Sequence, residues 1–261
     1  MLPKSIMKVS ILMTTYNKNE MLPNVLYSII RQNPPFPYEI CIIDDCSDID
    51  PEPIIRKFAP NTIYKRLEKH VGFMYAGNNY LDLISKNTDV VVLQSCDVIH
   101  VQNNTIEELC KFVREKTISL AEVIDIPINI NLYQNFDIEI KEILSNWNKY
   151  ITTIAQKANR ERSNTQIDKI EYPLWTKYSG KNYPGWLFFL GAIKREDLEK
   201  IEYDKNSCDA VIAPKMKSLN FKAEYPEVKG IHQRHPKTIY YCPIVKECEY
   251  DCGRRQGKCQ K

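Results

Sequence analysis

Glycine, long apolar runs and an excess of charge of one sign are all scarce in this chain. Only eight of its 261 residues are glycine, and the formal net charge is +3. So small a charge gives no reason to expect nucleic acid or an anionic membrane as a partner. No run approaches the roughly 18 apolar residues that a membrane-spanning helix needs. The opening residues also lack an apolar signal-peptide core with a small-residue cleavage site, so we expect a soluble, cytoplasmic protein.

The nine cysteines form no regular framework. Their number is odd and no secretion signal accompanies them, so we expect free thiols in a reducing compartment. Four of them gather in the segment 239–261, with the spacing C-x5-C-x3-C-x6-C. Zinc sites are better indicated by paired C-x2-C motifs. A structural zinc, free thiols and disulfides therefore all remain open for this Cys-rich tail.

The length suits one large α/β domain, and 43% hydrophobic residues supply a sizeable core. Strand-length apolar runs alternate with helical spacing through the first half, which is typical of βαβ units and a parallel sheet. The predicted strands there are Lys8–Thr15, Glu39–Ile43, Thr62–Arg66 and Asp89–Leu93. The predicted helices there are Asn19–Gln32, Pro51–Phe58, Phe73–Ser85 and Thr105–Glu115. The second half is less regular, with a predicted strand at Leu120–Ile126 and predicted helices at Ile138–Ala158 and Ser207–Leu219.

One stretch, DVVVLQSCDVIH at Asp89–His100, organises the rest of the chain. Its run Val90–Leu93 is rich in β-branched residues and predicts a strand buried on both faces. The run then breaks into polar residues that end in Asp97. Because open α/β sheets bind ligands just outside the carboxyl ends of their strands, Asp97 is a candidate active-site carboxylate. The alternative is an Asp that starts a turn or caps the next helix.

Three stretches in order, VSILMTTYNKNEMLPNVLYSIIRQ, EICIIDDCSD and VVLQSCD, resemble the opening of the family 2 glycosyltransferases, which have the GT-A fold. The resemblance covers Val9–Asp97 and resumes at Gly185–His232. It implies a Rossmann-like, mostly parallel central sheet flanked by helices. Residues 1–118 would then form a nucleotide-sugar-binding half, and residues 119–238 an acceptor-side half of the same domain. Members of the family transfer a sugar from a nucleotide-diphosphate donor to an acceptor, usually with inversion.

Three residues match the positions that hold the nucleotide in this family. Thr14 and Tyr16 stand at the end of the first strand, where Tyr16 can stack on the base. Asp45 matches the second Asp of the family's paired-Asp motif, the residue that contacts the base in that family. A carboxylate accepts the N3–H of uracil well, so the resemblance favours UDP. The alternative is that Thr14 and Tyr16 only bond nearby backbone, and Cys46 stands where the family commonly has Gly.

Asp97 matches the last Asp of the family's D-x-D motif, the one that touches a divalent metal. Ser95 replaces the first carboxylate, and we place Ser95 and Cys96 with the donor-binding residues of this turn. Mn²⁺ or Mg²⁺ can be held by one or two carboxylates together with phosphate oxygens. His232 matches an occasional third metal ligand, with His235 as its rival. A structural role is the alternative for either histidine.

The segment NSCDAVIAPKMKSLNFKAEYPEVKGIH resembles the region that carries the family's catalytic base. Asp209 stands where that base is expected, and Cys208 stands where Glu is usual. A carboxylate near a helix start stays ionised, helped by the helix dipole, and it would take the proton of the acceptor hydroxyl. The alternative is an Asp that only caps the helix. Trp186 falls in an acceptor-side loop of the family, although WLFFLGAI also suits a core strand.

The sequence therefore predicts an inverting glycosyltransferase that acts on a nucleotide-diphosphate sugar and on a glycan or another hydroxyl acceptor. The first alternative is a nucleotide-sugar-binding protein that has lost transfer, because Ser95 and Cys208 replace carboxylates. The second is a nucleotidyltransferase. Such enzymes usually show a Gly-rich, Lys/Arg-bearing loop after the first strand, and TTYNKNE does not have that form. The sequence makes no prediction of the oligomeric state, the sugar or the linkage.

Overall fold

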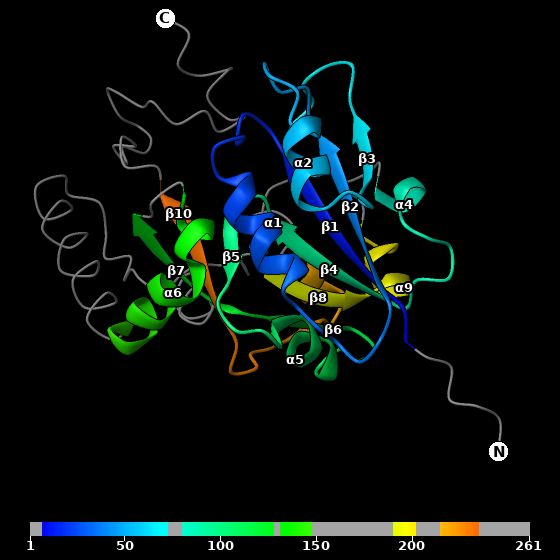
Figure 1. Ribbon diagram of the computed structural model, residues 1–261. Coiled ribbons are helices and arrows are strands. Elements are labelled where there is room, and N and C mark those ends of the chain that lie inside the picture. The colour runs from blue at the N-terminus through cyan, green and yellow to red at the C-terminus, as the bar shows by residue number, and fades with distance from the viewer. Residues whose placement is uncertain (1–6, 73–79, 128–130, 148–189, 202–214, 235–261) are drawn as a thin grey trace, which may run out of the picture.

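The computed structural model describes residues 7–72, 80–127, 131–147, 190–201 and 215–234. Within these residues the chain forms one sheet of seven strands and a second sheet of three (Figure 1). No helix in this part of the chain is both long and apolar enough to cross a membrane. The fold class predicted from the sequence is confirmed: an α/β architecture with a large, mostly parallel central sheet flanked by helices.

The large sheet has the strand order β3-β2-β1-β4-β8-β6-β9. The first four of these are mutually parallel, whereas β8 runs antiparallel to both of its neighbours. A parallel sheet over the first half was predicted from the alternation of strand and helix, and it is confirmed. The strands are β1 (Val9–Thr15), β2 (Tyr38–Asp44), β3 (Ile63–Arg66), β4 (Val90–Ser95), β8 (Leu190–Lys194), β6 (Thr117–Leu120) and β9 (Lys222–Glu224).

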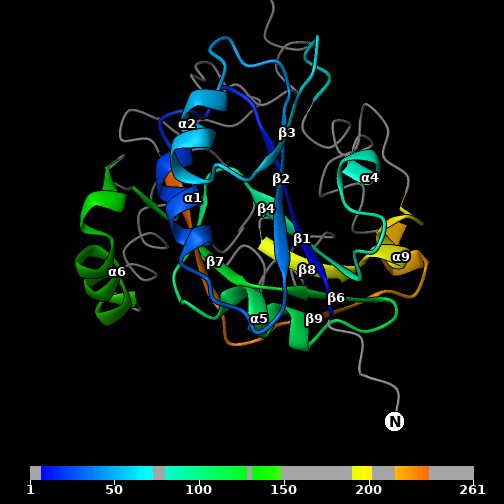
Figure 2. The same ribbon diagram turned by 45° about the vertical axis from the view of Figure 1, so that its right-hand side comes forward.

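Helices cover both faces of this sheet (Figure 2). In β1, Val9, Ile11 and Met13 point into one apolar cluster with the α1 side chains, whereas Leu12 points into a second cluster on the opposite face. This alternation follows from the period of two residues in a strand, and the mostly apolar run of β1 suits a strand that is covered on both faces. The helices involved are α1 (Leu22–Ile30), α2 (Glu52–Phe58) and α5 (Thr105–Lys111) on the first cluster, and α4 (Tyr80–Leu83) and α9 (Arg195–Leu198) on the other side.

The order of the strands places a switch point beside β1. From β1 the chain moves outward to β2 and β3, and it then returns to place β4 on the opposite side of β1. Connections at such a point leave the sheet in opposite directions, which opens a crevice at the carboxyl ends of the strands. The polar residues predicted to bind the donor follow β1, β2 and β4, so this crevice is where the fold gathers them.

A smaller sheet packs against helix α6 (Phe136–Ser145) and has the strand order β5-β10-β7. Its strands are β5 (Val98–His100), β10 (Lys229–Arg234) and β7 (Glu122–Pro127). The strand predicted at Leu120–Ile126 is present as β7, but it begins at Glu122, because Leu120 belongs to β6 of the large sheet. The chain changes sheets at Ala121, whose N–H donates to the carbonyl of Leu190, while the N–H of Glu122 donates to the carbonyl of Val228.

The other predicted elements differ mainly at their ends. Helix Thr105–Glu115 stops at Lys111, because Phe112 and Val113 donate to carbonyls three residues back and tighten the last turn. Of the predicted helix Phe73–Ser85, only Tyr80–Leu83 is described as helical, and residues 73–79 lie outside the described residues. The 3-10 helix η2 (Leu132–Asn135) leads into α6, and much of the predicted helices Ile138–Ala158 and Ser207–Leu219 also lies outside the described residues.

The close pairing of β8 with β6 leaves no room for a side chain at Gly191, and this can be tested. A Cβ atom there would lie 2.7 Å from Cδ2 of Leu120 and 2.8 Å from the carbonyl oxygen of Ser119. We expect Gly191→Ala to lower the free energy of unfolding by about 1–3 kcal/mol, since backbone must move to relieve the overlap. Urea unfolding measures this. Gly230→Ala is the control, because its Cβ would approach only side-chain atoms, those of Val98 and Val123 at 3.2 Å and of Leu190 at 3.4 Å. Equal losses for both variants would contradict the prediction.

Candidate active site

The carboxylate of Asp97 is the centre of the candidate site. It follows β4, and it is only 4% exposed. Ser95 donates its hydroxyl to Oδ1 of Asp97 at 2.6 Å. On the other oxygen, His232 Nε2 lies 3.3 Å and Lys18 Nζ 3.4 Å from Oδ2. The structure thus brings together Ser95, Asp97 and His232, as the sequence predicted, and adds Lys18, which the sequence analysis did not select.

The charges around Asp97 fix its ionisation. Burial alone would raise the pKa of this carboxyl group, but the charges of His232 and Lys18 and the hydrogen bonds from His232 and Ser95 outweigh burial. The pKa of Asp97 therefore lies well below its usual range. A carboxylate held ionised in a buried place is suited to binding a cation or to placing a positively charged side chain.

A divalent cation fits this site only with help from a ligand. Within the described residues, no group of three or more His, Cys, Asp or Glu side chains is arranged to hold a metal ion. Asp97 and His232 could supply one oxygen and one nitrogen ligand. Mg²⁺ and Mn²⁺ are often held by one or two carboxylates plus substrate phosphates, so the donor set fits a cation that arrives with a diphosphate.

A second cluster lies at the ends of β1 and β2, around the carboxylate of Asp45. This group is fully buried, and its two oxygens accept the N–H groups of Val71 at 2.8 Å and Gly72 at 2.9 Å. His70 Nδ1 lies 2.9 Å from Oδ2 of Asp45, and its ring stacks on Tyr16 with a centroid separation of 4.0 Å. Tyr16 and Asp45 are therefore close together, as predicted, with one face of Tyr16 covered by His70.

The turn after β2 is shaped by Asp44 and not by glycine. The buried Asp44 carboxylate accepts the N–H and hydroxyl of Ser47, and it pairs with Arg66 on β3 at 2.6 Å. Between these residues, Cys46 has φ 64°, the left-handed conformation that glycine adopts most easily. Cys46, which stands where Gly was expected, therefore adopts a backbone conformation that glycine favours.

The remaining predicted residues fall in three places. Thr14 is buried in β1, in register with Ser95 of β4. Cys96 packs into the apolar cluster beneath the site, where burial and the charge of Asp97 raise the pKa of its thiol to about 12. Four others lie outside the described residues: Asp209, Cys208, His235 and Trp186.

The thiols that the structure describes are free, as predicted, and they belong to Cys41, Cys46, Cys96 and Cys110. The four cysteines of the tail lie outside the described residues. Lys18 and His70 were missed by the sequence analysis, although both lie inside the stretch that resembles the family. The available signal for Lys18 was a cation three residues beyond the end of a strand, at the edge where an active site was predicted.

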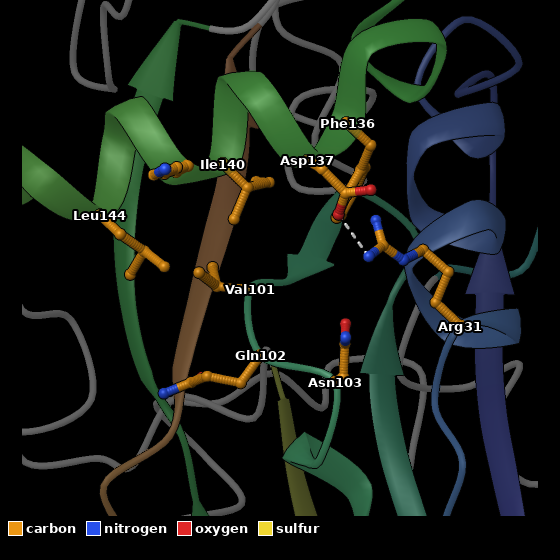
Figure 3. Close-up of a pocket in the computed structure, with 9 residues that line it drawn as sticks. Arg31, Val101, Gln102, Asn103, Phe136, Asp137, Ile140 and Leu144 are labelled. Atoms are coloured by element: carbon orange, nitrogen blue, oxygen red, sulfur yellow. Dashed lines mark hydrogen bonds and ion pairs between the residues drawn. The ribbon is translucent and has the colours of Figure 1, made fainter.

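A pocket of about 370 Å³ opens elsewhere, where the end of α1 meets α6 (Figure 3). Arg31 points from α1 toward Asp137 and forms an ion pair with it, and its guanidinium lies 4.7 Å from the ring centroid of Phe136. The lining includes none of the predicted site residues. The contacts of Arg31 join α1 to α6, so they stabilise the packing of the helices.

Solved structures with the same overall fold are glycosyltransferases. The chain is similar over 90% of its length to the mannosyltransferase PcManGT from Pyrobaculum calidifontis, solved with GDP-Man and Mn²⁺, with 17% identity, a TM-score of 0.55 and 59% of that chain covered. It is similar over 90% of its length to GalNAc-T7, solved with UDP, GalNAc and Mn²⁺, with 12% identity, a TM-score of 0.56 and 45% of that chain covered. The fold is therefore the GT-A glycosyltransferase fold.

The sequence comparisons agree with the fold. A model of the family "Glycosyl transferase family 2" matches residues 10–169, and the chain belongs to that family. It is 31% identical over 116 residues to the poly(ribitol-phosphate) β-N-acetylglucosaminyltransferase TarP of Staphylococcus aureus (strain N315), a match to 43% of this chain and 35% of TarP. It is 29% identical over 91 residues to the hyaluronan synthase of Pasteurella multocida, 34% of this chain and 9% of that protein. The chain thus spans about a third or less of these relatives.

The left-handed turn at Cys46 allows a direct test. We expect Cys46→Val to lower the free energy of unfolding by about 1–3 kcal/mol, since a β-branched residue is strained at positive φ. Cys46→Gly should stay within about 1 kcal/mol of the original, because relief of strain and the greater freedom of the unfolded chain oppose each other. Denaturant unfolding of both variants measures the difference, and similar values for Val and Gly would show that the turn does not depend on this conformation.

Proposed function

We propose that this chain transfers a sugar from a uridine-diphosphate donor to a hydroxyl acceptor, with inversion at the anomeric carbon. The observation that carries the proposal is the convergence of Tyr16, Asp45 and Asp97 at the switch-point edge of a GT-A sheet. Ligands bind at this edge in open α/β folds. In this proposal residues 1–118 serve the donor and residues 119–238 the acceptor, within one domain.

The base would lie between Tyr16 and Asp45. Both oxygens of Asp45 already accept N–H groups, which supports a role as acceptor for the N3–H of uracil. An ionised carboxylate has about four lone-pair positions, so it can accept the uracil N3–H beside the bonds from Val71 and Gly72 when His70 gives up its position 2.9 Å from Oδ2. To lie between Tyr16 and Asp45, the base would replace the imidazole ring of His70, which stacks on Tyr16 and lies 2.9 Å from Asp45.

The diphosphate would lie over Asp97. Asp97 and His232 would hold Mn²⁺ or Mg²⁺ together with phosphate oxygens, and the cation would offset negative charge on the leaving diphosphate. Lys18 contributes a second positive charge at the same carboxylate. Thr14 and Ser95, adjacent across β1 and β4, fix the floor of this region, and Cys96 anchors the turn in the core.

Asp209 is the proposed general base. It would take the proton of the acceptor hydroxyl as that oxygen attacks the anomeric carbon, while the bond to the diphosphate oxygen breaks. One such displacement gives inversion. The support for Asp209 is its match to the family's base position, with Cys208 in place of the usual Glu.

A nucleotide-sugar-binding protein without transfer is the second candidate function. One observation favours it. Ser95, which stands in place of a carboxylate, donates its hydroxyl to Asp97, and Lys18 and His232 contact the same carboxylate. Such a site can bind a diphosphate through its positive charges alone. Donor turnover separates the two functions.

The first test concerns the nucleotide and the cation. We expect UDP to bind more tightly than GDP in calorimetry, and Mn²⁺ to strengthen UDP binding, because the cation and the diphosphate complete one site. Asp97→Ala should remove the effect of Mn²⁺. Asp197→Ala is the matched control, since Asp197 is equally buried and paired with Lys200 at 3.0 Å, but on α9. Tighter GDP binding would contradict the uracil assignment, and equal UDP affinity with and without Mn²⁺ would contradict the cation site.

The second test concerns the base. We expect Asp209→Asn to leave UDP affinity nearly unchanged and to slow sugar transfer by on the order of 10²–10⁴-fold, because the amide cannot accept the proton. The assay is a screen of UDP-, GDP- and TDP-sugars with Mn²⁺, scored by transfer or by slow hydrolysis of the donor. Transfer at the original rate would show that Asp209 is not the base. No turnover of any donor by the unchanged protein would favour the binding-protein function.

A further inference from the structure

The turn that carries Asp97 is held from inside by one side chain, that of Gln94 at the end of β4. Gln94 is 3% exposed. Its Nε2 donates to the carbonyl of Ser95 at 2.8 Å and to the carbonyl of Val98 at 2.7 Å. These two carbonyls lie on either side of Cys96 and Asp97. Gln94 therefore joins both ends of the turn Ser95–Val98. This turn contains no glycine and a single carboxylate, that of Asp97.

His100 on β5 fixes the direction of the Gln94 amide. Its Nε2 lies 2.5 Å from Oε1 of Gln94. Because the amide nitrogen of Gln94 faces two carbonyl oxygens, the amide oxygen faces the ring, so Nε2 of His100 must carry the proton and donate it. The other ring nitrogen, Nδ1, is buried with no partner among the described residues. Burial lowers the pKa of His100 to about 3, which keeps the ring neutral at physiological pH.

The same turn is held from outside by β10. The N–H of Gln233 donates to the carbonyl of Asp97 at 2.8 Å, and β10 also carries His232, which contacts the Asp97 carboxylate. His100 pairs with Gly230 of β10 in the small sheet. The contacts of Gln94 and the contacts of β10 thus hold the same short segment, Ser95–Val98, from two sides.

We propose that Gln94 and His100 are positioning residues that set the place of the Asp97 carboxylate for the cation and the diphosphate. A site with one carboxylate depends on the position of that group more than a site with several, and the described residues place no second carboxylate beside Asp97 to compensate for a shift. Loss of a partner that orients a metal ligand typically weakens metal affinity or activity about 10- to 100-fold. This inference rests on the proposed function.

The chain offers a matched control for Gln94 in Gln32, at the end of α1. Gln32 is 5% exposed. Its Nε2 also donates to two backbone carbonyls, those of Ser28 at 3.1 Å and Gln102 at 2.8 Å, and its Oε1 accepts the N–H of Ile106 at 3.3 Å. Gln94→Leu and Gln32→Leu therefore remove similar buried hydrogen bonds, and both should lower the midpoint of urea unfolding. Gln32 touches neither the turn nor Asp97.

The first measurement is the effect of Mn²⁺ on UDP affinity. We expect Gln94→Leu to reduce this effect by about tenfold or more, and Gln32→Leu to leave it unchanged. His100→Phe removes the donor to Gln94 while keeping a flat ring, and it should reduce the effect less than Gln94→Leu does. It also serves as the second variant if Gln94→Leu does not fold.

The second measurement needs no ligand. Because His232 contacts Asp97, a displacement of the Asp97 carboxylate changes the imidazole ¹⁵N signals of His232 in labelled protein. These signals are assigned with a His232→Asn variant. We expect Gln94→Leu, or His100→Phe in its place, to move these signals toward their positions in Asp97→Asn. Gln32→Leu should not move them.

The two measurements separate the failure of this inference from that of the proposed function. Unchanged His232 signals and unchanged Mn²⁺ dependence in Gln94→Leu and in His100→Phe would overturn the positioning role, whatever the stability of the variants. Equal effects from Gln94→Leu and Gln32→Leu would also overturn it, since they would reflect general destabilisation. If the unchanged protein binds neither UDP nor GDP, the proposed function fails, and the ¹⁵N signals still decide whether Gln94 and His100 position Asp97.

Discussion

The buried carboxylate of Asp97 is the charge on which the edge of the sheet depends. An ionised group taken out of water is costly unless it is paired and hydrogen-bonded. Here the partners come from separate parts of the chain: Lys18 after β1, Ser95 at the end of β4 and His232 on β10. The need to compensate one charge therefore joins three segments that are far apart in sequence. The site and the fold are held together by the same contacts.

A similar principle acts at the second cluster, where Asp45 is the buried charge. Its oxygens hold the backbone of Val71 and Gly72 and the ring of His70. The loop after β3 is thereby tied to the end of β2, and His70 is placed against Tyr16. In the proposed function, these two buried aspartates would serve the two parts of the donor, Asp45 the base and Asp97 the diphosphate.

The sequence was sufficient for most of the first half because its strands are strongly apolar. Runs such as Val90–Leu93 must be buried on both faces, and polar residues directly after them mark the functional edge. Strand β5 was not predicted because three residues, VIH, follow a polar turn without any period that a pattern can detect. The break at Ala121 was also hidden, because no Gly or Pro between Ile118 and Ile126 marks the point where the chain passes from one sheet to the other.

The candidate site was predictable to the extent that its residues sit in a family motif. Asp45, Asp97 and Tyr16 were found in this way, and the structure places each at the expected edge. Lys18 and His70 were not, because a contact with a buried carboxylate depends on the three-dimensional course of two loops. Gln94 carries no motif at all. Its importance follows only from hydrogen bonds to Ser95 and Val98, which no sequence spacing specifies.

The short links between the two sheets also determine how this part of the chain can unfold. One residue, Ala121, separates β6 from β7, and two residues separate β4 from β5. Each of these pairs has one strand in the large sheet and the other in the small sheet. Because these links are so short, a strand that leaves one sheet would pull on its neighbour in the other. The donor side and the small sheet therefore form one cooperative unit, in which local opening at the site is resisted by the whole core.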